Sequence, residues 1–387
     1  MSSNDTTNEA RKIDKLRMHS AILKMSMREP VHALPAEIDS IPDQPAVFLL
    51  WAGEGKPYLA RTTLLRRRLK RLISERDRVS RVLNLRGVAE RIEYWLTGSQ
   101  IEAALIHLEL AQRYFPDDWP RLTRLRPPVV VRLTLDNPFP RTMITTRLGK
   151  GLHFGPFANR AAAEHFENAV LDLFQLRRCE ENLTPSPNHP GCIYGEMSRC
   201  LRPCQQAVTI DEYRNEAARV EQFFRTNGAS LEDSAESARD RASAEMQFEE
   251  AERLHQRVER IREVRAMAGE LARSLDSLNG VAVAPSADPD AVELWFMLGG
   301  SWIASRRLPL AGGAGQSMDH RLREILAELP AGSAPQPEHL SILLRWHRSS
   351  WRDGEWIPFE SLDRFPYRKL VNAIGRVHQK ATSRMPA

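Results

Sequence analysis

The chain has 387 residues, with 55 Lys and Arg against 50 Asp and Glu. This length suits two to four compact modules, and the 42% hydrophobic content excludes a wholly disordered protein. No apolar run reaches the roughly 18 residues of a membrane span, and the first residues carry charge where a signal peptide is apolar. We therefore expect a cytoplasmic protein with no membrane association.

The basic residues are mostly Arg. Eight of the 55 are Lys, which leaves 47 Arg. Arg binds phosphate through paired hydrogen bonds that Lys cannot make, which favours a polyanionic partner such as DNA. An Arg-rich composition alone explains the count equally well, so the positions of these residues must decide between the two interpretations.

The N-terminal third alternates strand and helix signals after a polar segment, residues 1–40, that we expect to be a loose arm. Short apolar runs bounded by Pro and Gly predict strands, and apolar residues at helical spacing predict helices. The predicted elements are a strand at 45–52, a turn at 53–57, a strand from 58, a helix at 61–76, a strand at 90–97 and a helix at 99–115. The 61–76 helix has an apolar stripe and a strongly basic outer face that includes Arg66, Arg67 and Lys70.

The remainder of the chain mixes strands with longer helices. The predicted elements are two strands within 128–147, a loop at Gly155-Pro156, helices at 160–176, 210–226 and 235–268, strands at 280–286 and 291–308 with a hairpin turn at Gly299-Gly300, and helices at 319–328 and 366–381. The second and third helices are expected to fold back on each other at Asn227-Gly228. Trp346, Trp351 and Trp356 are expected to be core or interface residues. This order of elements predicts an α+β multidomain protein.

All four cysteines fall in one window of 26 residues, with the spacing C-x12-C-x7-C-x3-C: Cys179, Cys192, Cys200 and Cys204. A cytoplasmic protein does not rely on disulfides, so clustering indicates a metal site. Four thiolates suit tetrahedral zinc or an iron–sulfur cluster, and the spacing does not choose between them. Four Arg residues beside the window offset its negative charge: Arg177, Arg178, Arg199 and Arg202.

Four segments together resemble the UvrC family, the incision subunit of bacterial nucleotide excision repair, over about residues 42–310. They are the cysteine window, LTLDNPFPR (133–141), HFGPF (153–157) and AEMQFEEAERLHQRVERIREV (244–264). The resemblance implies a small GIY-YIG-like α/β domain, a cysteine-rich metal-binding region, a UVR helical hairpin and a C-terminal α+β segment. The predicted boundaries are an arm at 1–40, a degenerate GIY-YIG-like domain at 41–125, linker strands and cysteines at 126–209, the hairpin at 210–270 and the start of the UvrC middle domain at 271–387.

The resemblance also implies a cofactor and partners. It favours Cys179, Cys192, Cys200 and Cys204 as ligands of a [4Fe–4S] cluster, with zinc as the alternative. It implies binding to DNA, and to a UvrB-like helicase through residues 244–264, with Phe248 and Glu249 matching the motif. An exposed aromatic side chain on a two-helix unit is a suitable anchor for a partner; packing within the chain is the competing interpretation.

The nuclease signature is incomplete. A GIY-YIG site resembling the family's needs two tyrosines, an arginine and a metal-binding glutamate. Tyr58 and Arg68 occupy catalytic positions and Arg61 stands where the family has lysine, but Phe48 replaces the first tyrosine and His107 falls at the glutamate position. Arg61 and Arg68 are seven residues apart, about two helical turns, and are expected on one face. Imidazole is a poor magnesium ligand, so the sequence predicts an inactive site, with Mg²⁺ bound only if the site is active.

Three functions remain open. The first is a UvrC-like repair factor that binds DNA without cutting it, truncated before the family's RNase H-like and helix–hairpin–helix domains. The second is an active single-incision endonuclease similar to Cho, in which a displaced carboxylate such as Glu109 serves the metal. The third is an iron–sulfur sensor or scaffold protein whose basic helix reflects composition.

Overall fold

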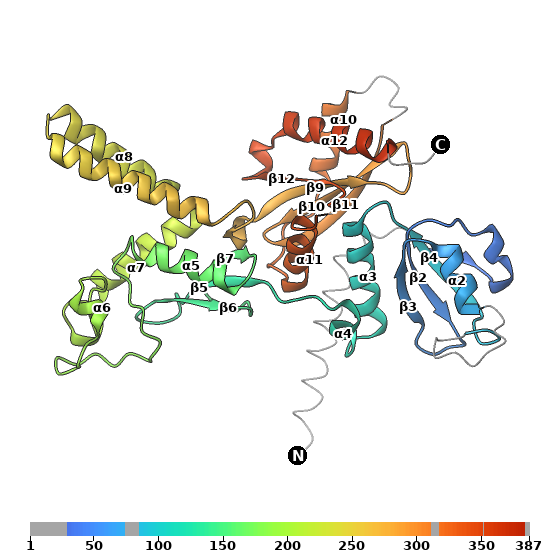
Figure 1. The fold of residues 1–387 in the computed structure, drawn as a ribbon, viewed down its shortest axis with the longest axis horizontal. Helices are drawn as coiled ribbons and strands as arrows, with labels where there is room; N and C mark the ends of the chain where they lie inside the picture. Colours follow the sequence, from blue (N-terminus) through green and yellow to red (C-terminus); the bar gives the residue numbers. More distant parts are fainter. Residues whose placement is uncertain (1–28, 74–84, 311–316, 351, 384–387) are drawn as a thin grey trace, which may run out of the picture. The chain divides into compact units, whose positions relative to one another are not determined.

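The computed structural model describes residues 29–73, 85–310, 317–350 and 352–383. These residues form two compact units (Figure 1). Unit 1 combines the chain up to residue 125 with 279–333 and 345–387, and unit 2 combines 126–278 with 334–344. The mixture of helices and antiparallel sheets confirms the predicted α+β class. No helix in the described part of the chain is both long and apolar enough to cross a bilayer.

The first sheet of unit 1 has the strand order β1-β4-β2-β3, with every pair antiparallel. Its strands are β1 (Val31–Ala33), β2 (Ala46–Trp51), β3 (Tyr58–Thr62) and β4 (Arg91–Leu96), so the three predicted strands are confirmed. The described part of the predicted loose arm is ordered instead, because β1 pairs with β4 and η1 (Pro35–Ser40) buries Ile38. Residues 1–28 lie outside the described residues.

Two helices cover opposite faces of this sheet, because side chains alternate between its faces. Helix α2 (Leu65–Ile73) packs Leu65, Leu69 and Leu72 on the face that carries Phe48 and Leu50. Helix α3 (Gln100–Tyr114) packs on the face that carries Val47 and Leu49. Ser99 caps its N-terminus, because the Ser99 hydroxyl oxygen accepts a hydrogen bond from the amide of Glu102. Helix α2 is shorter than predicted; it begins at Leu65, and residues 74–76 lie outside the described residues. Helix α4 (Trp119–Thr123) follows.

The second sheet of unit 1 has the order β11-β10-β9-β12. The strands are β9 (Asn279–Pro285), β10 (Ala291–Leu298), β11 (Ser301–Pro309) and β12 (Glu355–Phe359), accompanied by α10 (Met318–Ala327), α11 (Pro337–His347), η4 (Leu362–Arg364) and α12 (Tyr367–Thr382). The hairpin turn at Gly299-Gly300 is confirmed: both residues have positive φ, as a two-residue hairpin turn requires. The predicted core role of Trp346 and Trp356 is also confirmed, since both are buried; Trp351 lies outside the described residues.

Unit 2 contains a sheet of order β6-β5-β7-β8. Its elements are β5 (Val129–Leu133), β6 (Thr142–Thr145), β7 (Leu152–Phe157), α5 (Arg160–Leu171), α6 (Ile193–Glu196), η2 (Pro203–Gln205), β8 (Arg273–Ser274) and η3 (Leu275–Ser277). The predicted loop at Gly155-Pro156 is wrong, because both residues belong to β7. The register with β5 shifts at this point, and such an irregularity accommodates a proline that has no amide to donate.

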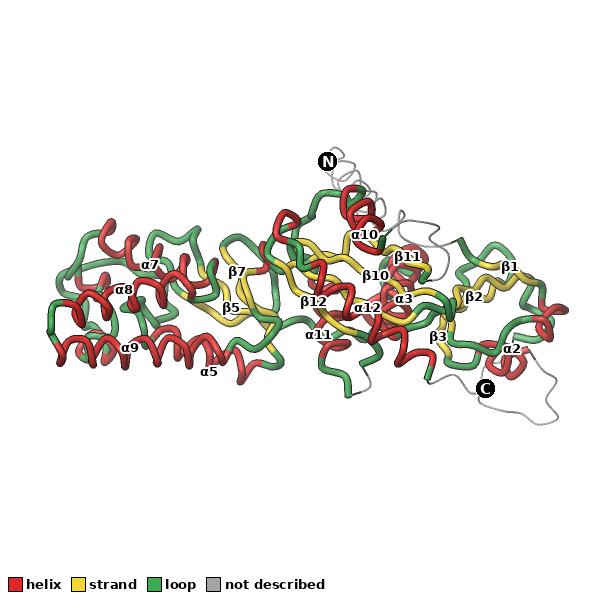
Figure 2. The backbone as a smooth tube through the Cα atoms, turned by 90° about the horizontal axis from the view of Figure 1, so that it is seen from above, coloured by secondary structure: helices red, strands yellow, loops and turns green. Residues whose placement is uncertain are grey.

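Three helices follow: α7 (Ile210–Arg225), α8 (Ala229–Ala244) and α9 (Phe248–Met267). The predicted turn at Asn227-Gly228 is confirmed, but the predicted continuous helix 235–268 is wrong. The chain reverses at residues 245–247, where Met246 takes a left-handed conformation (φ 59°) and the amide of Gln247 donates to the carbonyl of Ala242 at 2.9 Å, a helix-ending pattern usually built on glycine. Figures 1 and 2 show α8 and α9 side by side as an antiparallel hairpin.

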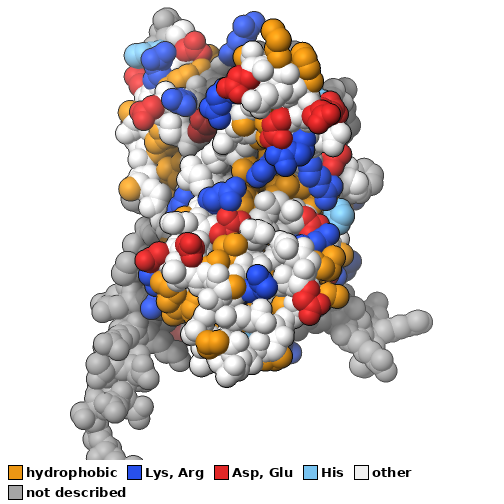
Figure 3. Space-filling model, turned by 90° about the vertical axis from the view of Figure 1, so that its left-hand side faces the viewer, with side chains coloured by type: hydrophobic (Ala, Val, Ile, Leu, Met, Phe, Trp, Pro, Cys, Tyr) orange, Lys and Arg blue, Asp and Glu red, His pale blue; other side chains and the backbone are white. Residues whose placement is uncertain are grey.

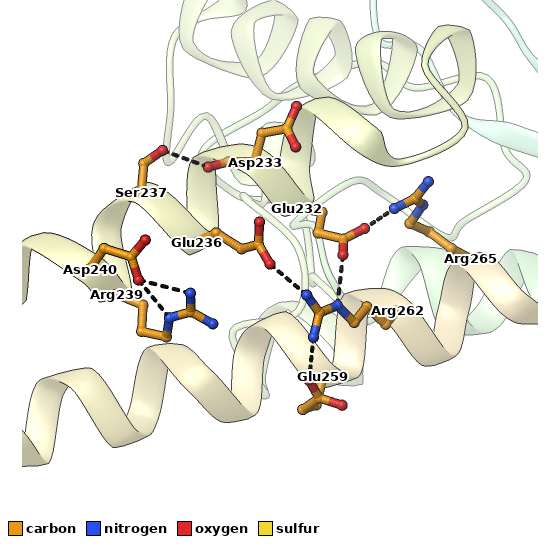
Figure 4. Close-up of polar contacts among 9 residues, drawn as sticks. All are labelled: Glu232, Asp233, Glu236, Ser237, Arg239, Asp240, Glu259, Arg262 and Arg265. Atoms are coloured by element: carbon orange, nitrogen blue, oxygen red, sulfur yellow. Dashed lines mark hydrogen bonds and ion pairs between the residues drawn. The ribbon is translucent and has the colours of Figure 1, made fainter. Parts of the chain in front are cut away.

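Ion pairs join the two helices of this hairpin (Figure 4). Arg262 of α9 pairs with Glu232 of α8 at 2.7 Å, with Glu236 of α8 at 2.5 Å and with Glu259 on its own helix at 2.7 Å. Arg265 also pairs with Glu232. Because a network shares one guanidinium among several carboxylates, it holds the pair of helices more firmly than isolated surface pairs would.

Candidate functional site

The structure brings together Tyr58 and Arg68. The Nη2 atom of Arg68 donates to the Tyr58 hydroxyl at 3.1 Å, from α2 to β3. The Phe48 ring lies beside them, its centroid 6.1 Å from that of Tyr58, and it is fully buried in the core between the sheet and α2. Phe48, which the resemblance aligns with the first tyrosine, is therefore a core side chain without a hydroxyl.

Arg61 and His107 lie on the other face of this sheet. Arg61 belongs to β3, where it alternates with Ala60 and Thr62 and shares the side of Leu59, which packs with α3. The Arg61 side chain is exposed to solvent. The prediction that Arg61 and Arg68 share one face is wrong, because α2 begins only at Leu65 and the two residues are not on one helix.

His107 is a buried, neutral residue of α3. The residue is 7% exposed. Burial, the main cause, and the positive charge of Arg61, the smaller one, lower the pKa of His107 to about 4. The structure thus places Tyr58 and Arg68 together on one face of the sheet, and Arg61 and His107 on the opposite face. Among the described residues, no carboxylate forms an ion pair with Arg68.

The basic face of α2 is partly neutralised. Arg67 pairs with Asp43 at 2.9 Å, Lys70 pairs with Asp39, and Arg66 donates to the Asp39 carbonyl at 3.3 Å. Both aspartates precede β2 in the chain. The side chains predicted to form an open cationic surface therefore have acidic or carbonyl partners within their own unit.

The four cysteines lie within electrostatic reach of one another. Cys192 precedes α6 and is exposed, Cys179 is half-buried, and Cys200 and Cys204 are buried, Cys204 within η2. Burial raises the pKa of Cys200 to about 11, and the charges of the other three thiols act in the same direction. In the described residues, however, no group of three or more potential ligands is arranged closely enough to hold a metal ion as it stands.

Two further observations concern whether these thiols suit a metal. The donor set is four thiols and no carboxylate, which is the chemistry of zinc and iron–sulfur sites. Beside it, Arg177 is 1% exposed, its Nη1 lies 3.5 Å from the sulfur of Cys179, and its Nη2 is buried without a hydrogen-bond partner. A buried cation with an unused donor fits an anionic centre at the cysteines.

Arg177 also connects segments that sequence reasoning did not link. Its Nε donates to the Phe139 carbonyl at 3.0 Å, and its amide donates to the Tyr213 hydroxyl at 3.0 Å. The same hydroxyl donates to the Pro140 carbonyl at 2.8 Å. The sequence flagged Arg177 by its place next to the cysteines, but nothing in the pattern indicated Tyr213, which belongs to α7.

The stripe predicted along residues 244–264 is divided. Val258 and Ile261 are fully buried in the core of unit 2, so packing within the chain accounts for that half. Phe248 is 71% exposed and Met246 75%, both at the tip of the hairpin, and Glu249 is exposed beside them. Figure 3 shows hydrophobic side chains exposed among charged ones on the end of unit 2 that carries the hairpin and the cysteine segment.

Comparison with known proteins bears on these observations. A family model described as "UvrC/Cho excinuclease, middle domain" matches residues 129–223. This match covers the β5–β7 strands, the cysteines and most of α7.

Several relatives carry the name "UvrABC system protein C". That of Dehalococcoides mccartyi is 24% identical over 89% of this chain and 58% of its own length, and that of Moorella thermoacetica is 25% identical over 76% of this chain and 48% of its own. The protein of Rickettsia felis is 27% identical over 55% of this chain.

No solved structure matches the chain. The chain spans about half the length of the curated relatives that it matches. Because the family model covers the cysteine segment and the relatives align with most of the chain, the protein is UvrC-like.

Proposed function

We propose that this protein is a nucleotide excision repair factor that binds DNA and whose GIY-YIG-like site does not cut it. The observation that carries the proposal is the environment of Tyr58: its hydroxyl is bound by Arg68, while the fully buried Phe48 occupies the place of the second hydroxyl. A phosphate-binding arginine is retained, whereas a group that positions the attacking water is replaced by a core side chain.

The metal-assisted step would also need a carboxylate beside Tyr58 and Arg68. His107, at the position of the family's glutamate, lies on α3 over the opposite face and is neutral at pH 7. The endonuclease alternative, similar to Cho, needs Glu109 as a displaced ligand, but Glu109 also belongs to α3. We therefore expect Phe48→Tyr combined with His107→Glu to leave incision undetectable, since the new carboxylate would lie next to Arg61.

The cysteine segment is proposed to hold a [4Fe–4S] cluster, with zinc as the alternative. Cys179, Cys192, Cys200 and Cys204 would be the ligands, and the bound group would supply a structural cross-link for this segment. Three features support this assignment. The donor set consists of thiols alone, the charges of the other three cysteines act on the thiol of Cys200, and the Nη2 of Arg177 has no hydrogen-bond partner.

The α8–α9 hairpin is proposed to bind a UvrB-like helicase through residues 244–264. Phe248 would be the anchor, with Glu249 beside it, because a largely exposed aromatic ring at the end of a rigid two-helix unit can enter a groove of a partner. The Arg262 ion pairs keep the two helices together and so present the tip in one conformation.

DNA titrations at several salt concentrations test the repair-factor proposal against the sensor or scaffold alternative. We expect the affinity of the full chain for nicked and damaged duplexes to fall steeply with salt. Arg68→Gln should make the slope of log affinity against log salt less steep by about 0.9, the contribution of one phosphate contact. Arg67→Gln is a matched control, because Arg67 is already paired with Asp43. Weak binding with a shallow salt dependence would favour the sensor or scaffold.

A further inference from the structure

Arg177 is a buried cation without a carboxylate partner among the described residues. It is 1% exposed, and its hydrogen bonds run to the carbonyls of Phe139, Cys179 and Glu181 at 3.0, 3.3 and 2.9 Å. Carbonyl oxygens satisfy donors but supply no full negative charge. A guanidinium removed from water is strongly destabilising unless an anion lies nearby.

The neighbouring arginines do not share this problem. Arg178 pairs with Asp172 at 2.7 Å and lies over the ring of Tyr194, and Arg199 pairs with Asp172 at 3.0 Å. One carboxylate thus serves both residues. No carboxylate among the described residues forms an ion pair with Arg177, and the sulfur of Cys179 lies 3.5 Å from its Nη1.

We infer that Arg177 is the built-in countercharge of the cysteine centre: it stabilises the negative charge of four thiolates gathered around a metal or cluster. Four thiolates exceed the charge of Zn²⁺ or of an oxidised iron–sulfur core, so the loaded centre is anionic. The unpartnered Nη2 is a further donor available to this anion. The inference rests on the proposed cysteine centre and makes Arg177 a positioning residue, not a ligand.

Metal retention by the full chain tests this role. Four proteins are compared: wild type, Arg177→Lys, Arg177→Gln and the control Arg178→Gln. Each is reconstituted anaerobically with ferrous iron and sulfide, or in a separate experiment with zinc. The half-time of metal loss to a chelator is then measured. We expect Arg177→Gln to lose metal about 10–100-fold faster, the range for outer-shell partners. Arg177→Lys, which keeps the charge, should recover most of the loss, and Arg178→Gln should resemble wild type.

A second measurement separates charge from folding. In a chain with all four cysteines replaced by Ala, the anion is gone, so Arg177→Gln should leave the melting temperature unchanged or raise it. In the loaded wild type the same substitution should lower it. The inference would be overturned if Arg177→Gln lowered the melting temperature equally in the loaded wild type and in the chain without cysteines. It would also be overturned if Arg177→Lys and Arg177→Gln lost metal at the same rate. Either result would show that Arg177 has only a structural hydrogen-bonding role. A wild type that binds neither iron nor zinc would instead refute the cysteine centre, and the countercharge with it.

Discussion

The proposed nuclease-like site and the cysteine segment, residues 178–209, differ in the structure that surrounds them. In the first, Phe48 and His107 are the residues that the resemblance aligns with a tyrosine and a glutamate, and both are buried. The sheet and its two helices fold without catalytic groups because their apolar cores, not the site, hold them together.

The cysteine segment has no such independence. Between α5 and α7 its regular structure is limited to α6 and η2, four and three residues long. All four thiols are nevertheless present, and Cys192 is exposed and adds nothing to a core. We expect a segment with this little regular structure to gain conformational stability from a bound metal or cluster. The comparison teaches that the sheet around Phe48 is held by its own apolar core, whereas the cysteine segment has little regular structure of its own.

The largest effect is expected at the cysteines. Cys200→Ala should abolish metal retention and open residues 178–209 to limited proteolysis, because one of the four proposed ligands is lost and the segment has little regular secondary structure. Peptide mapping of the cleavage sites measures this outcome. If the variant keeps wild-type protease resistance, the segment is held by packing and the contrast with the nuclease-like site disappears.

The second effect concerns the core of the nuclease-like site. Phe48→Ala should lower the free energy of unfolding by about 3–5 kcal/mol, as for other fully buried phenylalanines. The matched control is Phe248→Ala, whose ring is 71% exposed and which should change stability by less than about 0.5 kcal/mol. Urea denaturation gives both values. Comparable losses in the two variants would contradict the assignment of Phe48 to the core and Phe248 to a partner surface.

The third effect is a pH dependence from His107. In the folded protein its pKa is about 4, below the ordinary value of 6.5. The unfolded chain therefore binds a proton at His107 more readily than the folded chain. The free energy of unfolding is highest above pH 6.5, and it decreases as the pH falls from 6.5 toward 4. Between pH 7 and pH 5 this linkage amounts to about 2 kcal/mol. His107→Gln should flatten this part of the stability profile. A wild-type profile that is already flat would show that His107 is not desolvated.

Much of the fold could be predicted from the sequence because short apolar runs between turn residues and capped amphipathic stretches are local signals. Ser99 and the Gly299-Gly300 pair gave correct boundaries. The errors arose where tertiary packing overrides local preference. Met246 ends α8 in a conformation that favours glycine, and Pro156 sits inside a strand at a register shift. The missed elements α11 and β12 lie in a region where the sequence offered no assignment.

The candidate sites were predictable by residue type but not by arrangement. Arg61 and Arg68 were assigned to one face by helical spacing, which fails because Arg61 is on a strand. The cysteine cluster was evident from spacing, while the burial of Arg177 and its connection to Tyr213 depend on contacts between residues far apart in the chain. Charge counts likewise could not show that Asp39 and Asp43 neutralise part of α2.

The most direct test of the central claim is the single-turnover incision rate of the wild type, with magnesium or manganese on nicked and damaged duplexes, divided by that of Arg68→Ala. We expect both proteins to show no incision above the background without protein, so that the ratio does not differ from one, because Arg68 has no reaction to accelerate. A wild type faster by about 100-fold or more, the usual effect of removing one transition-state-stabilising group, would contradict it.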